Sequence, residues 1–187
     1  MNNSSDQTPD RTPSDAFSRL LEMARDNPSP PVDSWQPERT GTIDIRIDHH
    51  GDWFHENTRF KRAALVKLFA GILRLDDSEY YLVTPVEKLR IEVEDVPFVA
   101  VDFEVSQLET EQQIAVTTNV GDVVVLGAEH PLEMRSGVPY VHIRRGLWAR
   151  LLRSAFYRLI EVAEEVPDKP GHWIVRSDQQ QFSIGEV

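Results

Sequence analysis

Hydrophobic and polar side chains alternate over many short stretches of the chain, with the period of two that is typical of a strand with one buried face. The first such stretch runs from Thr42 to Asp48, where three isoleucines alternate with charged residues. Turn sequences such as Asn119-Val120-Gly121 separate neighbouring stretches and predict antiparallel hairpins. The same alternation predicts strands over residues 80–84, 89–93, 99–105, 114–118, 122–126, 140–143, 172–176 and 181–184.

Two longer segments have the helical period instead, with apolar side chains every three or four residues. One extends from about residue 57 to Arg74, and the other from about Gly146 to Glu164. A third, short amphipathic helix is predicted near the N-terminus, where Thr12 and Pro13 are residue types that favour a helix start. Because residues 1–40 also hold six of the twelve prolines, we expect a helical arm that docks on the body of the protein or on a partner.

A gapless shift of 87 residues brings the two long helical segments, and the strand before each of them, into register. Trp53 then aligns with Tyr140, and His55 with His142. Any two strand-then-helix segments of similar length could align this well by chance, and both explanations remain open. Taken as a repeat, the pattern predicts an α+β fold of two similar small units, each with a long helix against antiparallel strands. The expected organisation is a proline-rich arm over residues 1–41, a first unit over residues 42–111 and a second unit over residues 112–187.

The composition excludes several classes of protein. The 187 residues carry 20 Lys and Arg against 31 Asp and Glu, so the formal net charge is −11, which opposes attraction to nucleic acid or to an anionic membrane. No cysteine is present, which excludes disulfides, thiol nucleophiles and thiolate metal sites. Residues 1–13 lack the pattern of a secretory signal, and no stretch has the roughly 18 apolar residues of a membrane span, so a cytoplasmic protein is expected.

Two segments in the middle of the chain have distinctive sequences, Thr84-Pro85-Val86-Glu87-Lys88 and Asp95-Val96-Pro97-Phe98. Together with weaker segments between Gly51-Asp52-Trp53-Phe54 and Phe182-Ser183-Ile184-Gly185, they resemble the bacterial family catalogued as domain of unknown function 1285. The resemblance implies a fold of two similar small α/β units. It also implies a family without an established activity, for which a role in signalling has been suggested, and it supplies no catalytic residues.

Basic residues gather in the two long helical segments. Five lie between Thr58 and Arg74 and five between Arg144 and Arg158, in both cases without an acid. Some of them are expected at helix starts, where the helix dipole disfavours a cation unless an anion is close. That anion is either an acid of the chain or an acidic ligand, and both alternatives remain open. The cations in question are Arg59, Arg62, Arg144 and Arg145, and the candidate acids of the chain are Glu87, Glu92, Glu94 and Asp95.

These charges lead to one hypothesis for a binding site, a cleft between the two units in which arginines hold an anion and Glu87 orients one of them. The aligned histidines and the bends near residues 84–88 and 118–122 add polar groups, although a hydrogen-bonded core histidine and an ordinary turn explain them equally well. The principal candidates are Arg62, Glu87, Lys88, Asn119 and Arg144, and the secondary candidates are His55, His142, Thr84, Asp95 and Asp122.

The common phosphate-binding and serine-hydrolase motifs are absent from the sequence, and His49, His50 and His55 lack the spacing of a metal site. We therefore expect no catalytic residue, metal or cofactor. The preferred function is a non-catalytic module that binds a small acidic molecule or a protein partner, and neither nucleic acid nor a membrane; the resemblance adds the suggested role in signalling. Two alternatives remain: a hydrolase that uses a carboxylate pair, and a scaffold that binds through the N-terminal arm. The sequence predicts no oligomeric state.

Overall fold

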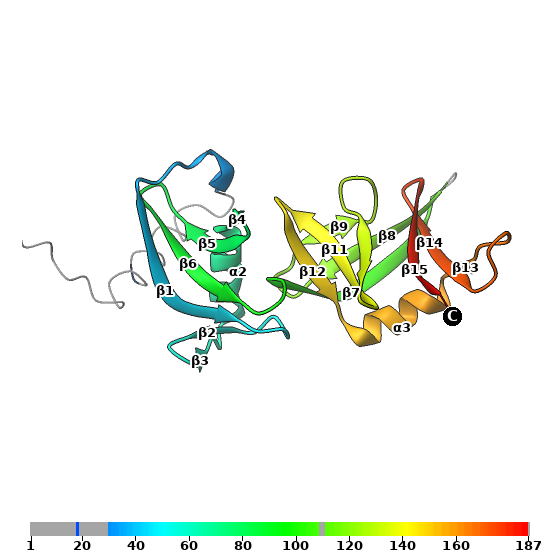
Figure 1. The fold of residues 1–187 in the computed structure, drawn as a ribbon, viewed down its shortest axis with the longest axis horizontal. Coiled ribbons are helices and arrows are strands. Elements are labelled where there is room, and N and C mark those ends of the chain that lie inside the picture. Colours follow the sequence, from blue (N-terminus) through cyan, green and yellow to red (C-terminus); the bar gives the residue numbers. More distant parts are fainter. Residues whose placement is uncertain (1–17, 19–29, 109–110, 187) are drawn as a thin grey trace, which may run out of the picture.

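The computed structural model describes residue 18 and residues 30–108 and 111–186, and just over half of these described residues are in strands. These ranges contain fifteen β-strands, two α-helices of nine residues each and a short 3-10 helix, η1 (Val32–Ser34). Two units follow one another along the long axis of the molecule (Figure 1). The expected α+β fold with a long helix in each unit is therefore wrong, because the described part of the chain is mostly β.

The first unit is a six-stranded sheet with one helix packed against it. Its strands have the order β3-β2-β1-β6-β5-β4, and all neighbours are antiparallel except β1 and β6, which run parallel. The helix buries Phe69 and Ala70 in the core of this unit. The elements are β1 (Arg39–Ile47), β2 (Trp53–His55), β3 (Thr58–Arg59), α2 (Ala63–Gly71), β4 (Leu73–Asp76), β5 (Glu79–Val83) and β6 (Glu87–Val93).

The second unit has the same sheet topology as the first. Its strands have the order β10-β11-β12-β7-β8-β9, and they are again antiparallel apart from one parallel pair, β12 and β7. Each sheet thus consists of two three-stranded meanders, joined by a parallel pair between the first and the last strand of the unit. The elements are β7 (Phe98–Gln107), β8 (Gln112–Thr118), β9 (Val123–Val125), β10 (Leu132–Arg135), β11 (Val138–Arg144) and β12 (Leu147–Leu151).

This repeat relates β1–β6 to β7–β12, and it differs from the repeat predicted from the sequence. The two helices that the shift of 87 residues aligns do not correspond. α2 lies between the third and fourth strands of its unit, whereas α3 (Arg153–Glu161) follows the sixth strand of the second unit. The structure therefore has a repeat-like architecture of two units, but the predicted register between them is wrong.

Both long helices predicted from the sequence are shorter in the structure, because strands occupy part of each segment. Leu73–Asp76 forms β4, and Leu147–Leu151 forms β12 ahead of α3. Leu147 and Leu151 are four residues apart, a spacing that places two side chains on one face of a strand as well as on one face of a helix. Since Ala149 between them is also buried, the segment fits equally a half-buried strand, and pairing with β7 decides the outcome.

Five hairpins share one turn geometry. Each has a two-residue turn in which both residues have positive φ, from 48° to 50° at the first residue and from 61° to 77° at the second. This is the signature of a type I′ turn, whose twist matches that of the strands it joins. The residues on either side of each such turn therefore form paired antiparallel strands. The turns are Glu56-Asn57, Asp77-Ser78, Ser136-Gly137, Arg145-Gly146 and Asp178-Gln179.

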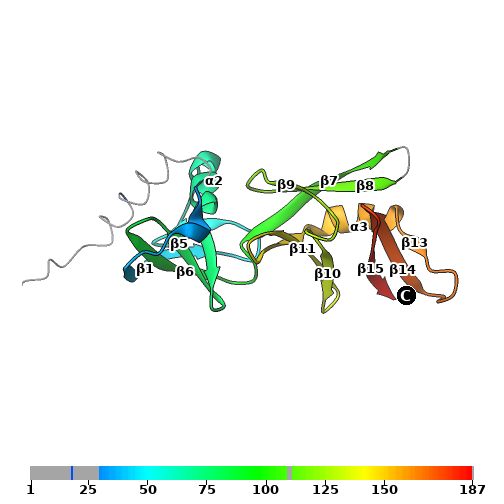
Figure 2. The same ribbon diagram turned by 90° about the horizontal axis from the view of Figure 1, so that it is seen from above.

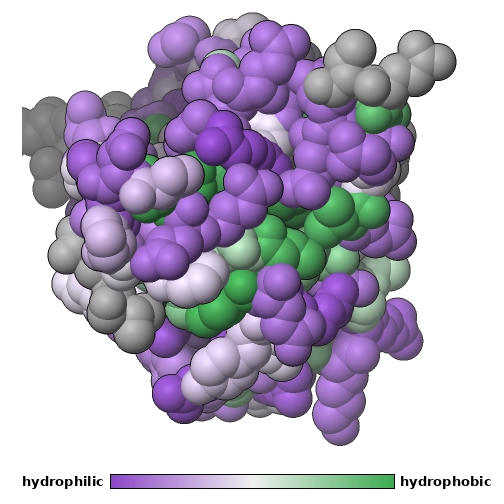
Figure 3. Space-filling view, turned by 90° about the vertical axis from the view of Figure 1, so that its right-hand side faces the viewer, coloured by the Kyte–Doolittle hydropathy of each residue, from purple (hydrophilic) through white to green (hydrophobic). Residues whose placement is uncertain are grey.

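A third, three-stranded sheet follows α3 and packs against the second unit (Figure 2). The buried Ser177 hydroxyl links the two, because it donates to the carbonyl of Leu126 (2.7 Å) and accepts from the N–H of Ile114 (2.9 Å). Figure 3 views this end of the molecule and shows a band of apolar side chains between hydrophilic ones. The strands are β13 (Glu164–Glu165), β14 (His172–Ser177) and β15 (Gln180–Glu186).

The predicted helical arm lies outside the described residues, apart from residue 18. From Pro30 onward the chain is held against the first unit, where the Arg74 guanidinium donates to the carbonyls of Val32 (3.0 Å) and Trp35 (2.9 Å). Neither α2 nor α3 has the length and apolar character that a membrane-crossing helix needs.

Candidate functional site

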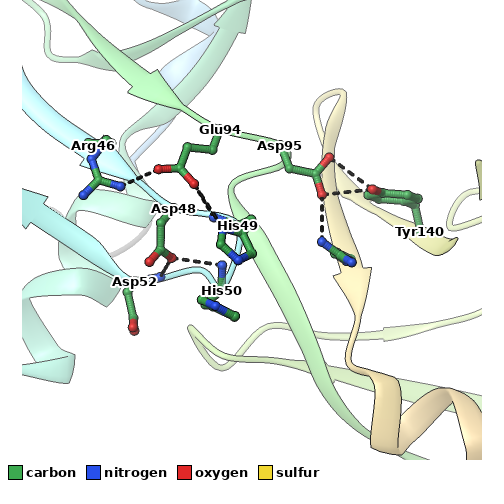
Figure 4. Close-up of polar contacts among 9 residues, drawn as sticks. Arg46, Asp48, His49, His50, Asp52, Glu94, Asp95 and Tyr140 are labelled. Carbon is green, nitrogen blue, oxygen red and sulfur yellow. Dashed lines mark hydrogen bonds and ion pairs between the residues drawn. The ribbon is translucent and has the colours of Figure 1, made fainter.

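The four-residue linker between β6 and β7 joins the two units through two consecutive carboxylates (Figure 4). Glu94 faces the first unit, where it pairs with Arg46 and accepts from both the backbone N–H and Nδ1 of His49, each at 3.1 Å. Asp95 faces the second unit, where it accepts from the Tyr140 hydroxyl (2.9 and 3.1 Å) and lies 3.8 Å from the Arg150 guanidinium. Each unit therefore makes hydrogen bonds to one of the two linker carboxylates.

The loop between β1 and β2 lies beside this linker and carries two exposed histidines, His49 and His50. The Asp48 carboxylate closes the loop, because it accepts from the N–H groups of His50 and Asp52, both at 2.9 Å. Gly51 has a φ of 79° and permits the tight turn.

The Asn119 side chain connects this loop to the second unit. Its amide donates to the carbonyl of Gly51 (3.2 Å) and accepts from the N–H of Val99 (3.1 Å), so a single side chain bridges the two units. A Cβ atom added at Gly51 would lie 2.7 Å from the Asn119 amide nitrogen, which explains why the loop has glycine there. The histidines are thus held at a defined place at the junction.

A cavity of about 690 Å³ opens at this junction, and we call it the junction cavity. Its wall combines basic and apolar side chains, and none of the described residues that line it is acidic, although the chain has a net charge of −11. The Arg150 guanidinium lies 3.8 Å from the Asp95 carboxylate, which is a long ion pair. The exposed Arg153 at the start of α3 has no acid within 4 Å among the described residues. The lining residues are His49, His50, Val99, Gly137, Val138, Pro139, Arg150, Leu151, Leu152, Arg153, Phe156 and Tyr157.

Apolar surface remains open inside the junction cavity. The Leu152 residue is 43% exposed and Tyr157 is 56% exposed, which is high for residues of these types. The Arg153 guanidinium lies over the Tyr157 ring at 5.9 Å from its centre. The cavity wall therefore has cationic side chains next to solvent-exposed hydrophobic side chains. Among the described residues, no group of three or more His, Asp or Glu side chains is placed to hold a metal ion.

Two groups at the junction have shifted pKa values. The hydrogen bond from the His49 ring, then that from its backbone N–H, and finally Arg46 hold the pKa of Glu94 below its usual value. Burial, and next the hydrogen bond to Asp95, raise the pKa of Tyr140. Glu94 is therefore ionised, and Tyr140 protonated, across the physiological range.

We expect the stabilising effect of Glu94 to disappear in acid. Since its pKa in the folded protein lies below the value of about 4.5 in an unfolded chain, its contribution is complete above about pH 4.5 and is lost as the pH falls toward the lower folded pKa. Glu94→Gln should therefore be less stable than wild type at pH 7, and the difference in unfolding free energy should shrink below about pH 4.5. Urea unfolding at several pH values measures it.

The matched control for this prediction is Glu104→Gln, which changes an exposed glutamate of β7. Its difference from wild type should not vary in the same pH window. A difference between Glu94→Gln and wild type that stays constant from pH 7 to pH 3 would contradict the assignment.

The residues predicted as a cleft from the sequence do not gather at one place. Asn119 lies at the junction, as described above. Arg144 pairs with Asp122, donates to the carbonyl of Ala70 in the first unit (3.0 Å) and covers the Phe98 ring at 4.9 Å. Only Asn119 and Arg144 of the five principal candidates therefore contact both units through the bonds described.

The other three principal candidates lie on the first unit. Lys88 pairs with Asp76 at 3.1 Å and lies over the Tyr81 ring. Glu87 is buried at the start of β6, and the exposed Arg62 directly precedes α2.

The secondary candidates have structural contacts. The Thr84 hydroxyl donates to the carbonyl of Glu87 (3.0 Å) and closes the bend between β5 and β6. The His142 ring bridges the carbonyl of Glu129 (2.9 Å) and the N–H of Gly146 (3.2 Å). His55 is half-buried at the end of β2, Asp95 is in the linker, and Asp122 pairs with Arg144.

Of the four arginines expected at helix starts, only Arg62 is there, because Arg59 lies in β3, Arg144 in β11 and Arg145 in a hairpin turn. The helix dipole therefore says nothing about three of them. Arg59 pairs with Asp52, and Arg144 with Asp122, neither of which was among the expected acids.

From the sequence, His49 and His50 were expected only to lack the spacing of a metal site, and Arg150 and Arg153 were counted only among the basic residues of a predicted helix. A sequence signal for the junction did exist. Two five-residue segments share one pattern: the first residue has a side-chain oxygen, and Gly-Asp occupies the fourth and fifth positions. The segments are Asp48-His49-His50-Gly51-Asp52 and Thr118-Asn119-Val120-Gly121-Asp122. Both form the same turn, in which the glycine N–H bonds back to the first residue at 2.9 and 3.0 Å. Asn119 of the second turn contacts Gly51 of the first.

Comparison with known proteins identifies the family. Residues 30–96 match the model described as domain of unknown function (DUF1285), N-terminal domain. Residues 97–184 match the model of the C-terminal domain of the same family. None of the curated proteins compared with the chain matches it.

Two crystal structures of DUF1285 family proteins are similar to this chain. The one from Silicibacter pomeroyi DSS-3 has 40% sequence identity and a TM-score of 0.79, over 90% of this chain and 95% of its own. The one from Shewanella baltica OS155 has 35% identity and a TM-score of 0.53, over 63% of this chain and 90% of its own. The resemblance seen in the sequence is thus confirmed, and the chain belongs to the DUF1285 family.

Proposed function

We propose that this protein is a non-catalytic, cytoplasmic binding module whose ligand is an organic anion with an apolar body, bound in the junction cavity. One observation carries the proposal: the wall of this cavity combines a weakly paired arginine, Arg150, and an arginine without an ion pair among the described residues, Arg153, with exposed apolar side chains. A volume of about 690 Å³ is within the usual range for small-molecule sites.

The polar part of the wall favours a carboxylate or phosphate. Arg150 and Arg153 present planar guanidinium groups, which bind such anions through paired hydrogen bonds. His49 and His50 lie on the opposite unit, so a ligand that reaches both walls would contact both units. Such a ligand would stabilise the junction, and on this physical basis we propose a role in signalling.

The apolar part of the wall favours a ligand with a hydrophobic body over a small inorganic ion. Leu152 and Tyr157 have apolar surface that a ligand would remove from water, at a gain of roughly 25 cal/mol per Å². No serine, threonine or cysteine is among the described residues that line the cavity, so it lacks the common nucleophiles. The histidines therefore act in binding in this proposal.

Thermal unfolding with a panel of aromatic and acyl carboxylates and phosphate monoesters tests the proposal. A ligand that binds only the folded state raises its stability, by about 2.7 kcal/mol at one hundred times its dissociation constant. Arg153→Gln should weaken binding by roughly tenfold, since it removes a charge-assisted hydrogen bond but keeps a good helix former at the start of α3.

Arg39→Gln is the matched control, because it makes the same change of charge at an exposed residue that does not line the cavity. It should bind like wild type. The proposal fails when no anion of the panel shifts the unfolding temperature, or when Arg153→Gln binds as tightly as the control.

A further inference from the structure

Arg145 borders two further cavities on another part of the junction. The smaller one, about 200 Å³, lies between the C-terminal half of α2 and the second unit. The larger one, about 550 Å³, lies between η1 and the first unit. Lys67, Asp122 and Arg144 line the smaller cavity together with Arg145, and Asp33, Arg74, Asp76 and Lys88 line the larger one with it.

The smaller cavity has more positive than negative charge. Its described lining residues include three cations, Lys67, Arg144 and Arg145, but only one acid, Asp122. The Arg144 guanidinium already has two partners, because it pairs with Asp122 and donates to the carbonyl of Ala70. Among the described residues, Lys67 and Arg145 form no ion pair inside this cavity, where the one acid, Asp122, pairs with Arg144.

Arg145 is only weakly neutralised from outside. The nearest acid among the described residues is Asp33, at 3.9 Å, and the Asp33 side chain is 65% exposed to water. The Arg145 side chain itself is only 26% exposed. Burial is the largest effect and lowers the pKa of Arg145; Asp33 raises it, the nearby Arg144 lowers it again, and Asp122 raises it. A partly buried cation beside a second guanidinium is unfavourable unless an anion binds there.

Among its described lining residues, the larger cavity offers Arg145 one acid within 4 Å, the exposed Asp33. Arg74 and Lys88 share the single carboxylate of Asp76, at 2.7 and 3.1 Å. Two cations thus compete for one acid on that side of Arg145 as well. The excess of positive charge is local, since the whole chain is strongly acidic.

We infer that Arg145 and Lys67 form a second anion site, independent of the junction cavity, that binds a phosphate group. A guanidinium fork beside an ammonium group is well suited to phosphate, which accepts paired hydrogen bonds and a point charge. A volume of about 200 Å³ holds a phosphate group but leaves little room for the apolar body of the ligand proposed above. The phosphate is either free or the end group of a small phosphomonoester.

The turn that carries Arg145 allows an informative substitution. Arg145 has a φ of 50° and is followed by Gly146, in a type I′ turn. Asn-Gly is the preferred sequence for this turn, so Arg145→Asn removes the cation without harm to the hairpin. Arg145→Lys keeps the charge but loses the planar fork.

Calorimetric titration and phosphorus NMR with inorganic phosphate, at constant ionic strength, test the inference. We expect saturable binding to wild type, weakened at least tenfold in Arg145→Asn and by less in Arg145→Lys. Arg39→Gln, which removes an equal charge elsewhere, should bind like wild type. Arg153→Gln should also bind phosphate normally, which separates this site from the junction cavity.

Glucose 6-phosphate, as a second probe, distinguishes the two sources of the phosphate group. Tighter binding than that of inorganic phosphate identifies a phosphomonoester, and weaker binding identifies the free ion. The inference is overturned when wild type shows no saturable binding of either probe, when Arg145→Asn binds as tightly as wild type, or when Arg39→Gln loses as much affinity as Arg145→Asn.

Discussion

Trp53→Ala is expected to lower the free energy of unfolding by about 3–5 kcal/mol, the usual range for a large aromatic side chain removed from a core. Trp53 is the first residue of β2 and is 1% exposed. Its ring stacks against Phe60 and Phe69, with centres 6.4 and 6.5 Å away. The substitution therefore leaves a cavity between α2 and the sheet of the first unit. Denaturant unfolding followed by far-ultraviolet circular dichroism measures the loss.

Trp53→Phe provides the control for this prediction. The Nε1 group of Trp53 is buried and has no hydrogen-bond partner among the described atoms, so its removal breaks no such bond. Phenylalanine keeps an aromatic ring against Phe60 and Phe69, and the loss should be clearly smaller than for alanine. An alanine variant that loses less than about 1 kcal/mol, or equal losses for both variants, would contradict the packing described.

Asn119→Ala is expected to lower the free energy of unfolding by about 1–3 kcal/mol, because it removes two hydrogen bonds and leaves their partners without them. The partners are the N–H of Val99 and the carbonyl of Gly51, which belong to different units. The substitution should therefore loosen the junction more than either unit. Hydrogen exchange at the Val99 amide, faster in the variant than in wild type, reports this local effect.

Gln113→Ala is the control for Asn119→Ala. It also shortens an amide side chain, but among the described residues the Gln113 side chain of β8 has no hydrogen bond that joins the two units. It should change stability by no more than about 0.5 kcal/mol. Asn119→Ala with the stability of this control and an unchanged exchange rate at Val99 would show that the bridge does not hold the junction.

Local patterns predicted most of the strands. The alternation in residues 42–48 and 99–105 corresponds to β1 and β7, because neighbouring side chains of a strand point to opposite faces wherever the strand pairs. The helical segments were less well predicted. A spacing of four residues, as between Leu147 and Leu151, does not distinguish a helix from a strand, and only the pairing of β12 with β7 does.

The binding site predicted from the sequence stays a prediction. Two basic segments and an anion between two units were expected, and in the structure four arginines line cavities at the junction, three of them in ion pairs. The particular residues differ, since ion pairs such as Arg144 with Asp122 join residues whose distance depends on the whole fold. His49 and Arg150 line the same cavity although they are far apart in the chain, and each contacts one linker carboxylate, Glu94 and Asp95 respectively.

The family, the strand-rich alternation and the turns can be predicted without the structure, because each of these depends on residues close together in the chain. The tertiary structure alone decided that β1 pairs in parallel with β6 and β12 with β7, and that two units with the same topology meet at a cationic cavity. A strand offers the same backbone groups to every partner, so the choice between distant partners depends on how both faces of each sheet are buried. That burial is a property of the folded chain as a whole.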